Sequence, residues 1–191
     1  MNIIRKIVEL VSVVTLLVIL LIASIVLAVG QKTIRKYPIP EHGTLELNVP
    51  TPWKGGIHKP QEKMAPTIIF NPEEGNDFQA LINVLWGKTG DQDFQSQEKV
   101  RTFVEKDGQK FLPNAAERNI VSQEIKGVTN VGYYFSITDK APNPGEYRYM
   151  TRGAIGVGTL FLNFTTLHRV KDSQSVRDAL SVFREARQSS K

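Results

Sequence analysis

Few side chains in this 191-residue sequence could carry out catalysis or hold a metal ion. The chain has no cysteine, which excludes disulfides, a thiol nucleophile, a thiolate metal site and a lipid-modified N-terminal cysteine. His42, His58 and His168 have no second histidine and no cysteine at the i+4 position, so we expect them on the surface or in loops. No serine lies in a G-x-S-x-G sequence. The sequence therefore predicts no catalytic residue, no cofactor and no metal site.

Three glycines, Gly153, Gly156 and Gly158, resemble a nucleotide-binding loop only superficially. Their spacing is not G-x-G-x-x-G, and the residues that follow favour a strand. A strand provides no helix N-terminus to bind a phosphate. We therefore interpret Gly156 to Gly158 as a tight hairpin turn.

The segment Asp139-Lys140-Ala141-Pro142-Asn143-Pro144-Gly145 is the best candidate for a binding surface. Its prolines stiffen the loop, which lowers the entropy lost on binding. Tyr134, Tyr147 and Tyr149 lie nearby in the sequence and could add amphipathic contacts. The alternative is a rigid hairpin connection whose tyrosines pack on the sheet. The residues expected to contact a partner are Asp139, Lys140, Pro142, Pro144, Glu146 and Tyr147.

Alternating apolar residues predict the strands that must position this loop. They indicate strands at 44–49, 67–70, 77–86 and 118–126, and three consecutive strands within 131–167. Helical spacing predicts one helix from residue 96 or 97 and a second after the candidate N-caps at 172–175. Trp53 is expected to fold back onto the core. The tail 188–191 is expected to fray.

The order of these elements, β-β-β-α-β-β-β-β-α, favours an α+β fold. Runs of strands without strict βα alternation predict a mostly antiparallel sheet of about six to seven strands. Apolar residues on both faces of residues 77–86 predict that the sheet is covered on both sides. The expected architecture is an α/β/α sandwich with one helix on each face.

A long apolar run from Leu10 to Val29 follows Arg5 and Lys6 near the N-terminus. Twenty residues in a helix span about 30 Å, which matches the hydrocarbon core of a bilayer. This length favours an uncleaved transmembrane anchor.

A cleaved signal peptide is the alternative to an anchor. Ala28-Val29-Gly30 supplies small residues for a cut after Gly30, which would release the domain into the periplasm. We therefore expect residues 1–30 to be the anchor or signal segment and residues 44–191 to form the domain. Residues 31–43 are expected to be a linker because they contain Pro38, Pro40 and Gly43.

The expected location is the cytoplasmic membrane, with a single span and the domain on the extracytoplasmic side. Basic residues flank the apolar run almost equally on its two sides. The opposite orientation, with the N-terminus outside and the domain in the cytoplasm, is therefore the alternative. The net charge of +5 is scattered over the chain and does not indicate a nucleic-acid partner.

Two stretches carry a resemblance to a known family. Leu45-Glu46-Leu47-Asn48-Val49-Pro50-Thr51-Pro52-Trp53, together with the order of elements, resembles the PsbP-like α/β/α sandwich superfamily, which includes the bacterial DcrB-type exported proteins and the eukaryotic Mog proteins. The stretch from Gly132 to Thr151 is similar to a group of uncharacterised bacterial exported proteins. The resemblance covers residues 44–187 and implies binding or assembly without catalytic residues.

The sequence therefore predicts a membrane-tethered or exported, non-enzymatic binding or assembly module of the bacterial cell envelope. Its expected partners are the membrane, through the N-terminal segment, and an envelope protein. The alternative is a small-molecule carrier or weak hydrolase that uses a cleft beside residues 139–146, with Asp139 or Glu146 as the acid–base group.

Overall fold

The computed structural model describes residues 31–58, 65–87 and 96–189. The predicted membrane segment from Leu10 to Val29 and the predicted cleavage site at Ala28 to Gly30 lie outside these residues. Among the described residues, no helix has the length and apolarity needed to cross a membrane. Residues Thr33–Lys191 group into one unit, and the fold described below belongs to it.

The unit contains ten strands, two α-helices and a short 3-10 helix among the described residues. The first half comprises β1 (Lys32–Pro38), β2 (Thr44–Pro50), β3 (Trp53–His58), β4 (Thr67–Pro72), β5 (Phe78–Trp86) and α2 (Gln97–Gln109). The second half comprises η2 (Leu112–Asn114), β6 (Gln123–Lys126), β7 (Val131–Thr138), β8 (Tyr149–Val157), β9 (Leu160–His168), α3 (Gln174–Glu185) and β10 (Arg187–Ser189).

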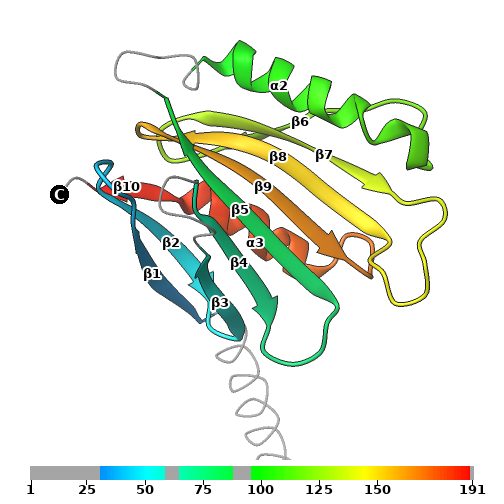
Figure 1. The fold of residues 1–191 in the computed structure, drawn as a ribbon, viewed down its shortest axis with the longest axis horizontal. Coiled ribbons are helices and arrows are strands. Elements are labelled where there is room, and N and C mark those ends of the chain that lie inside the picture. The colour runs from blue at the N-terminus through cyan, green and yellow to red at the C-terminus, as the bar shows by residue number, and fades with distance from the viewer. Residues whose placement is uncertain (1–30, 59–64, 88–95, 190–191) are drawn as a thin grey trace, which may run out of the picture. The chain divides into compact units, whose positions relative to one another are not determined.

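A seven-stranded main sheet has the order β3-β4-β5-β9-β8-β7-β6 (Figure 1). Each of its strand pairings is antiparallel. A second, small sheet has the order β1-β2-β10. The prediction of an α+β fold with a mostly antiparallel sheet is confirmed.

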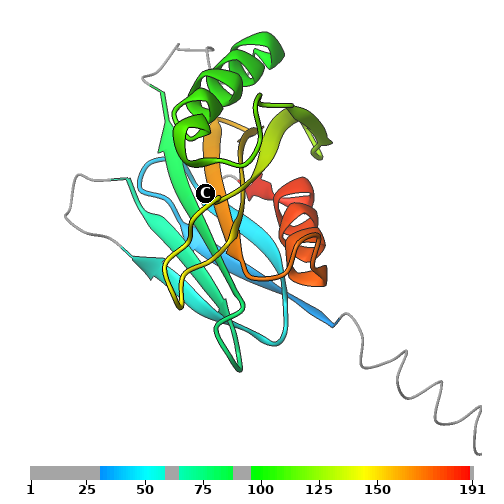
Figure 2. The same ribbon diagram turned by 90° about the vertical axis from the view of Figure 1, so that its right-hand side faces the viewer.

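The two helices cover opposite faces of the main sheet (Figure 2). Val100 and Val104 of α2 pack in one apolar cluster with Phe135 of β7 and Phe161 of β9. On the other face, α3 and the inner side of the small sheet share a larger cluster. Phe183 of α3 stacks on a main-sheet ring there, with centroids 4.0 Å apart. The expected helix on each face is present, but the small sheet completes one of the two outer layers.

The small sheet is the main departure from the predicted organisation. Residues 31–43 were expected to be a linker, but Lys32–Pro38 form β1. Tyr37 and Ile39 are buried in the main core, which explains why the chain is ordered there. Pro38 is the last residue of the strand, where its missing N–H interrupts no ladder.

The C-terminal tail also differs from its prediction. Residues 188–191 were expected to fray, yet Arg187–Ser189 pair with β2 in antiparallel register. The Gln188 Nε2 donates to the His42 carbonyl at 2.6 Å, which ties the tail to the turn between β1 and β2. Residues 190 and 191 lie outside the described part of the chain.

Smaller differences concern individual strands. Residues 53–58 form the unpredicted edge strand β3, and the strand predicted at 118–126 is restricted to Gln123–Lys126. Trp53 is buried as expected and lies 4.8 Å from the ring of Phe78. The hairpin turn after β8 falls at Gly158 and Thr159, because β8 continues to Val157. Gly158 has a φ of +59°, which favours glycine at this turn.

Both predicted helix starts are confirmed by their caps. Ser96 accepts a hydrogen bond from the Lys99 amide and Ser173 accepts one from the Val176 amide. Helix α2 continues through Gly108 and ends at Gln109. A Cβ atom at this position would lie 2.9 Å from the Ile120 side chain, so glycine lets that residue pack against the helix.

Candidate functional site

The predicted binding loop, Asp139 to Gly145, is part of the longer connection 139–148 that joins β7 to β8 at one end of the main sheet. The Asp139 amide donates to the Arg148 carbonyl at 2.8 Å, which closes the base of the loop. Asp139 also forms an isolated antiparallel bridge with Ala115, which follows η2. The loop is therefore fastened both to its own hairpin and to the segment after α2.

The charged side chains of the loop mostly bond within it or to its support. Asp139 Oδ1 accepts from the Ala141 amide at 2.9 Å, as in an Asx-turn. Glu146 Oε2 accepts from both the amide and the side-chain Nδ2 of Asn143, at 3.1 and 3.0 Å. Lys140 Nζ donates to the Pro113 carbonyl at 2.5 Å. These groups hold the shape of the loop.

Arg169, just beyond the end of β9, clamps the far end of the loop. Its guanidinium donates to the carbonyls of Gly145 and Glu146 at 2.5 and 3.0 Å. It also donates to the Asn76 carbonyl at 3.2 Å, and it lies 5.1 Å from the centroid of the Tyr147 ring. One side chain thus joins the loop to the β4–β5 turn, a role the sequence pattern did not indicate.

A carboxylate outside the loop fixes the end of β7. Glu117 accepts from the amide and the hydroxyl of Thr138 at 2.8 and 2.9 Å. Burial alone would raise the pKa of Glu117, but these two bonds outweigh it and the pKa is lowered. The charged carboxylate of Glu117 therefore holds Thr138, the residue directly before Asp139.

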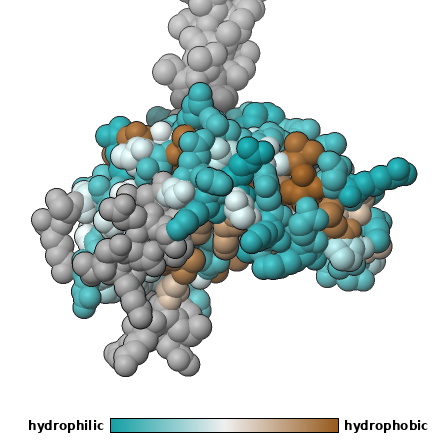
Figure 3. Space-filling model, turned by 90° about the horizontal axis from the view of Figure 1, so that it is seen from above, coloured by the Kyte–Doolittle hydropathy of each residue, from teal (hydrophilic) through white to brown (hydrophobic). Residues whose placement is uncertain are grey.

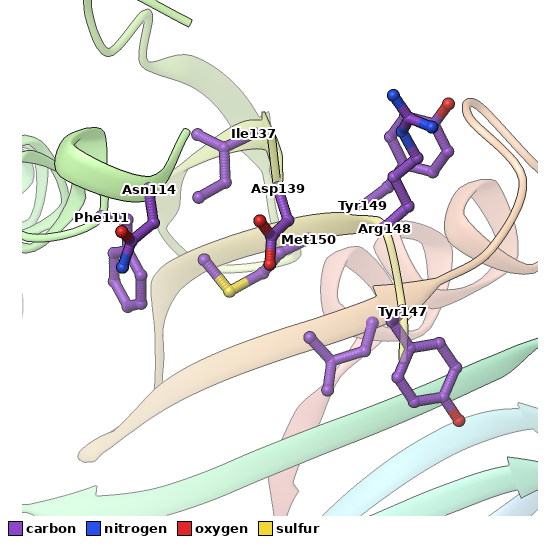
Figure 4. A pocket seen from close by; sticks show the side chains of 9 residues that line it. Phe111, Asn114, Ile137, Asp139, Tyr147, Arg148, Tyr149 and Met150 are labelled. Atoms are coloured by element: carbon purple, nitrogen blue, oxygen red, sulfur yellow. The ribbon is translucent and has the colours of Figure 1, made fainter. Parts of the chain in front are cut away.

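A pocket of about 210 Å³ opens between the loop and the end of α2. It is lined by Phe111, Asn114, Ile137, Asp139, Tyr147, Arg148, Tyr149, Met150 and Leu167. Figure 4 shows Asp139 and Met150 in its middle, with Phe111 and Asn114 on one side and Tyr147 on the other. Most of the lining is apolar or aromatic, so the pocket favours an apolar group.

An ion pair supports the α2 side of the pocket. Arg152 Nε donates to Asp107 Oδ2 at 2.5 Å, and Arg152 Nη1 donates to Thr165 Oγ1 at 2.6 Å. The guanidinium also lies 5.7 Å from the centroid of the Phe111 ring. Burial would raise the pKa of Asp107, but the bonds from Arg152 and Lys110 outweigh it and lower the pKa. The pair thus joins the end of α2 to β8 and β9.

The histidines only partly follow their prediction. His58 is exposed, and the half-buried His42 lies 5.1 Å from the ring of Trp86. The prediction that His168 lies on the surface or in a loop is wrong. His168 is the last residue of β9, is only 3 % exposed and stacks on Tyr149. Its Nδ1 lies 3.0 Å from the Val170 carbonyl, and Nε2 has no hydrogen-bond partner among the described residues.

The buried environment of His168 changes its titration. Burial lowers the pKa of its imidazole, and the bond to Val170 and the charge of Asp172 offset this only in part. The ring therefore stays neutral to a lower pH than an exposed histidine would.

The structure gathers the predicted site residues on one element but gives them unequal roles. Asp139 and Tyr147 line the pocket. Pro142 is half-buried, and Pro144 is exposed at the tip of the loop. Lys140 and Glu146 brace the loop. Sequence reasoning missed Phe111, Met150, Leu167 and Arg169, because their signals are those of ordinary core or surface residues.

The face seen from above α2 is mostly hydrophilic, with small and separate apolar areas (Figure 3). On this view the described residues form no broad apolar patch.

Comparison with one solved structure supports the fold. The solution structure of cyanobacterial PsbP (CyanoP) from Synechocystis sp. PCC 6803 matches with a TM-score of 0.51 and 11 % identity, over 84 % of this chain and 95 % of that one. A crystal structure from Bacteroides thetaiotaomicron VPI-5482 matches with a TM-score of 0.40 and 12 % identity, over 82 % of this chain and 49 % of that one. No family model and no curated protein sequence matches the chain. The chain has a PsbP-like fold, as the resemblance predicted.

Proposed function

We propose that this chain is a membrane-tethered or exported, non-enzymatic binding module of the bacterial cell envelope, whose pocket receives one apolar side chain of a partner protein. The observation that carries the proposal is the size and lining of the pocket. Its 210 Å³ is below the roughly 300–1,000 Å³ of typical small-molecule sites. A cavity of about 150 Å³ already holds benzene, so this volume suits one aromatic or branched aliphatic side chain.

The braced loop supports the same proposal. Because Arg169 and the intraloop bonds already fix residues 139–147, little conformational entropy remains to be lost on binding. The exposed Pro144 and the half-buried Pro142 and Tyr147 form a rim beside the pocket. An apolar anchor surrounded by such a rim is the usual arrangement of an energetically important interface site.

The non-enzymatic part of the proposal rests on the functional groups at the pocket. Asp139 is the carboxylate that lines it, and one oxygen of this group already accepts from the Ala141 amide. Figure 4 shows the Arg148 side chain directed away from that carboxylate. A paired acid and base facing a common reacting atom, which hydrolysis needs, is not among the residues that line this pocket.

The proposed location follows from the run Leu10 to Val29, whose length suits a single span. The short basic head before it favours an extracytoplasmic domain, or release into the periplasm if the chain is cut after Gly30. Protease added outside the cytoplasmic membrane should digest the domain. A domain that stays intact until the membrane is lysed would contradict this orientation.

The pocket is tested by photo-cross-linking in intact cells. A benzophenone amino acid replaces Tyr147 at the rim, and cross-linked proteins are identified by mass spectrometry. A Leu167→Phe substitution should fill the pocket and abolish the major cross-link. The matched control is Leu81→Phe, since Leu81 is another half-buried leucine on the same sheet face but does not line the pocket.

Two results would contradict the proposal. One is a cross-link that survives Leu167→Phe in a variant whose thermal melting matches the parent chain. The other is a small molecule that co-purifies with the parent chain and is lost in Leu167→Phe, which would favour the carrier alternative.

A further inference from the structure

The outer face of the small sheet carries a second hollow, far from the loop in sequence. The inner face of this sheet buries Leu45, Leu47 and Val49, so Ile34, Glu46 and Asn48 point outward. A groove of about 500 Å³ lies here, lined by Ile34, Glu46, Asn48, Val128, Glu185 and Arg187. We call this surface the outer face.

Most polar groups of the outer face are already paired. Glu46 forms an ion pair with Lys36 at 3.1 Å and accepts from Ser189 Oγ at 3.2 Å. Asn48 Nδ2 donates to Glu185 Oε2 at 2.8 Å. The apolar side chains of this surface face outward, since Ile34 is 61 % exposed and Val128 is 51 % exposed, and the exposed Arg187 lines the same groove. Exposed apolar side chains beside a groove of paired charges fit a surface that is itself partly apolar.

The covalent chain limits how far this face can lie from a membrane. Strand β1 begins at Lys32, so only Gly30 and Gln31 separate it from the apolar run that ends at Val29. Ile34 is five residues from Val29 and therefore at most about 18 Å from it, at no more than ~3.6 Å per residue. The headgroup layer on each side of a bilayer is roughly 5–8 Å thick. Ile34 is thus within reach of the lipid headgroups if the run spans the membrane.

We propose that the outer face contacts the lipid headgroup region, with Ile34 and Val128 as the inserted side chains. This inference rests on the membrane anchor of the proposed function. The pocket residues Ile137 and Met150 belong with the α2 side of the main sheet, whereas the outer face belongs with the α3 side. The contact would therefore leave the pocket turned away from the membrane and open to a partner.

The absence of native cysteine makes a direct test possible with the full chain. Single substitutions Ile34→Cys, Val128→Cys and Val121→Cys carry an environment-sensitive fluorophore. The proteins are reconstituted in vesicles of phosphatidylethanolamine and phosphatidylglycerol, with or without a lipid that bears a nitroxide on its headgroup. Val121 is the matched control because it is a 63 % exposed valine beside Ser122, which bonds to Glu105 of α2 at 2.7 Å.

The labels at positions 34 and 128 should lose emission when the nitroxide lipid is present, and their emission should shift to shorter wavelength in vesicles. The label at position 121 should show neither change. Equal quenching at all three positions in protein that floats with the vesicles would overturn the proposed contact and leave the anchor intact. Failure of the full chain to float with vesicles would overturn both the contact and the anchor, while the pocket would still be tested separately by the cross-link at position 147.

Discussion

Replacing Arg169 should loosen the binding loop without unfolding the domain. The perturbation is Arg169→Gln, which removes the charge and most of the donors. Arg169→Lys is the informative companion, because lysine keeps the charge but cannot donate to several carbonyls in fixed directions. The site is suited to this test because the guanidinium contacts the loop and the β4–β5 turn at once.

The expected size of the effect follows from these contacts. A hydrogen bond from a charged donor contributes roughly 1.5–3 kcal/mol, so three of them give an upper limit of about 5–9 kcal/mol. The Arg169 side chain is 28 % exposed, and water can hydrate the carbonyls of Gly145 and Glu146 once it is gone. We therefore take about a third of this sum. The free energy of opening the loop should fall by about 2–3 kcal/mol in Arg169→Gln. This corresponds to a roughly 30- to 150-fold change in the opening equilibrium.

Amide hydrogen exchange measures this opening directly. The Glu146 amide donates to the Asn143 carbonyl at 3.0 Å, and the Ala141 amide donates to Asp139 at 2.9 Å. Both amides should exchange roughly 30- to 150-fold faster in Arg169→Gln, and by an intermediate factor in Arg169→Lys. Amides in the interior of β5 should keep the protection they have in the parent chain.

The control is Arg177→Gln on α3. Arg177 also makes several polar contacts, including one from Nε to Gln174 Oε1 at 3.1 Å, but it touches no loop residue. Loop exchange that is unchanged in Arg169→Gln, or equally accelerated in Arg177→Gln, would refute the assignment of Arg169 as the clamp of the loop.

Three further predictions concern the stability of the domain. Asp107→Asn should lower the free energy of unfolding by about 2 kcal/mol in urea denaturation, since it leaves the half-buried Arg152 without its carboxylate. Because the pKa of Asp107 is lowered in the folded chain, this loss should begin to shrink as the pH falls below about 4, where the unfolded parent chain binds a proton at Asp107 before the folded chain does. A pH-independent loss would contradict this prediction. Gly153→Ala should lower the melting temperature, because a Cβ atom there would lie 2.3 Å from the Tyr133 carbonyl oxygen, and an unchanged melting temperature would disprove the close approach. His168 has a lowered pKa because of burial, so its unfolded form binds a proton first and stability should fall as the pH drops below about 6.5. His168→Phe should flatten the melting temperature between about pH 7 and pH 5, and an equally steep profile would count against the buried neutral ring.

The main sheet could be predicted because its strands carry their own signal. In β5, buried residues alternate with half-buried ones along Phe78–Trp86, and β7 is similar. Such alternation reports local burial on a pleated strand. The two helix starts were equally predictable from Ser96 and Ser173, which cap the helices through contacts only three residues apart.

The small sheet could not be predicted because its order comes from distant residues. Arg187–Ser189 is a polar tripeptide with no strand pattern, and it becomes a strand through pairing with β2. In β1, Tyr37 is buried while most of the other residues are exposed or half-buried. Pro38 and Pro40 suggested a spacer by composition, yet Ile39 between them is buried in the core.

The candidate loop was recognisable from its prolines, but the hydrogen-bond partners of its charged residues could not be predicted. Asp139, Lys140 and Glu146 looked like groups available to a partner, and the structure directs each of them to a backbone or side-chain group nearby. Their bonding partners depend on the three-dimensional path of the loop and of the segment after α2. Arg169 lies more than twenty residues from the loop tip and carried no local signal at all.

This division of roles bears on how the site would recognise anything. When the charges of a loop are used to fix its own shape, specificity comes from the fit of apolar groups and not from charge pairing. The pocket has that character, since six of its nine lining residues, including Phe111, Met150 and Leu167, are apolar or aromatic. The loop and the pocket then act as a single unit, in which Arg169 holds the rim and the lining selects the side chain. Binding should accordingly depend little on ionic strength, whereas recognition through free charges on the loop would weaken steeply as salt is added.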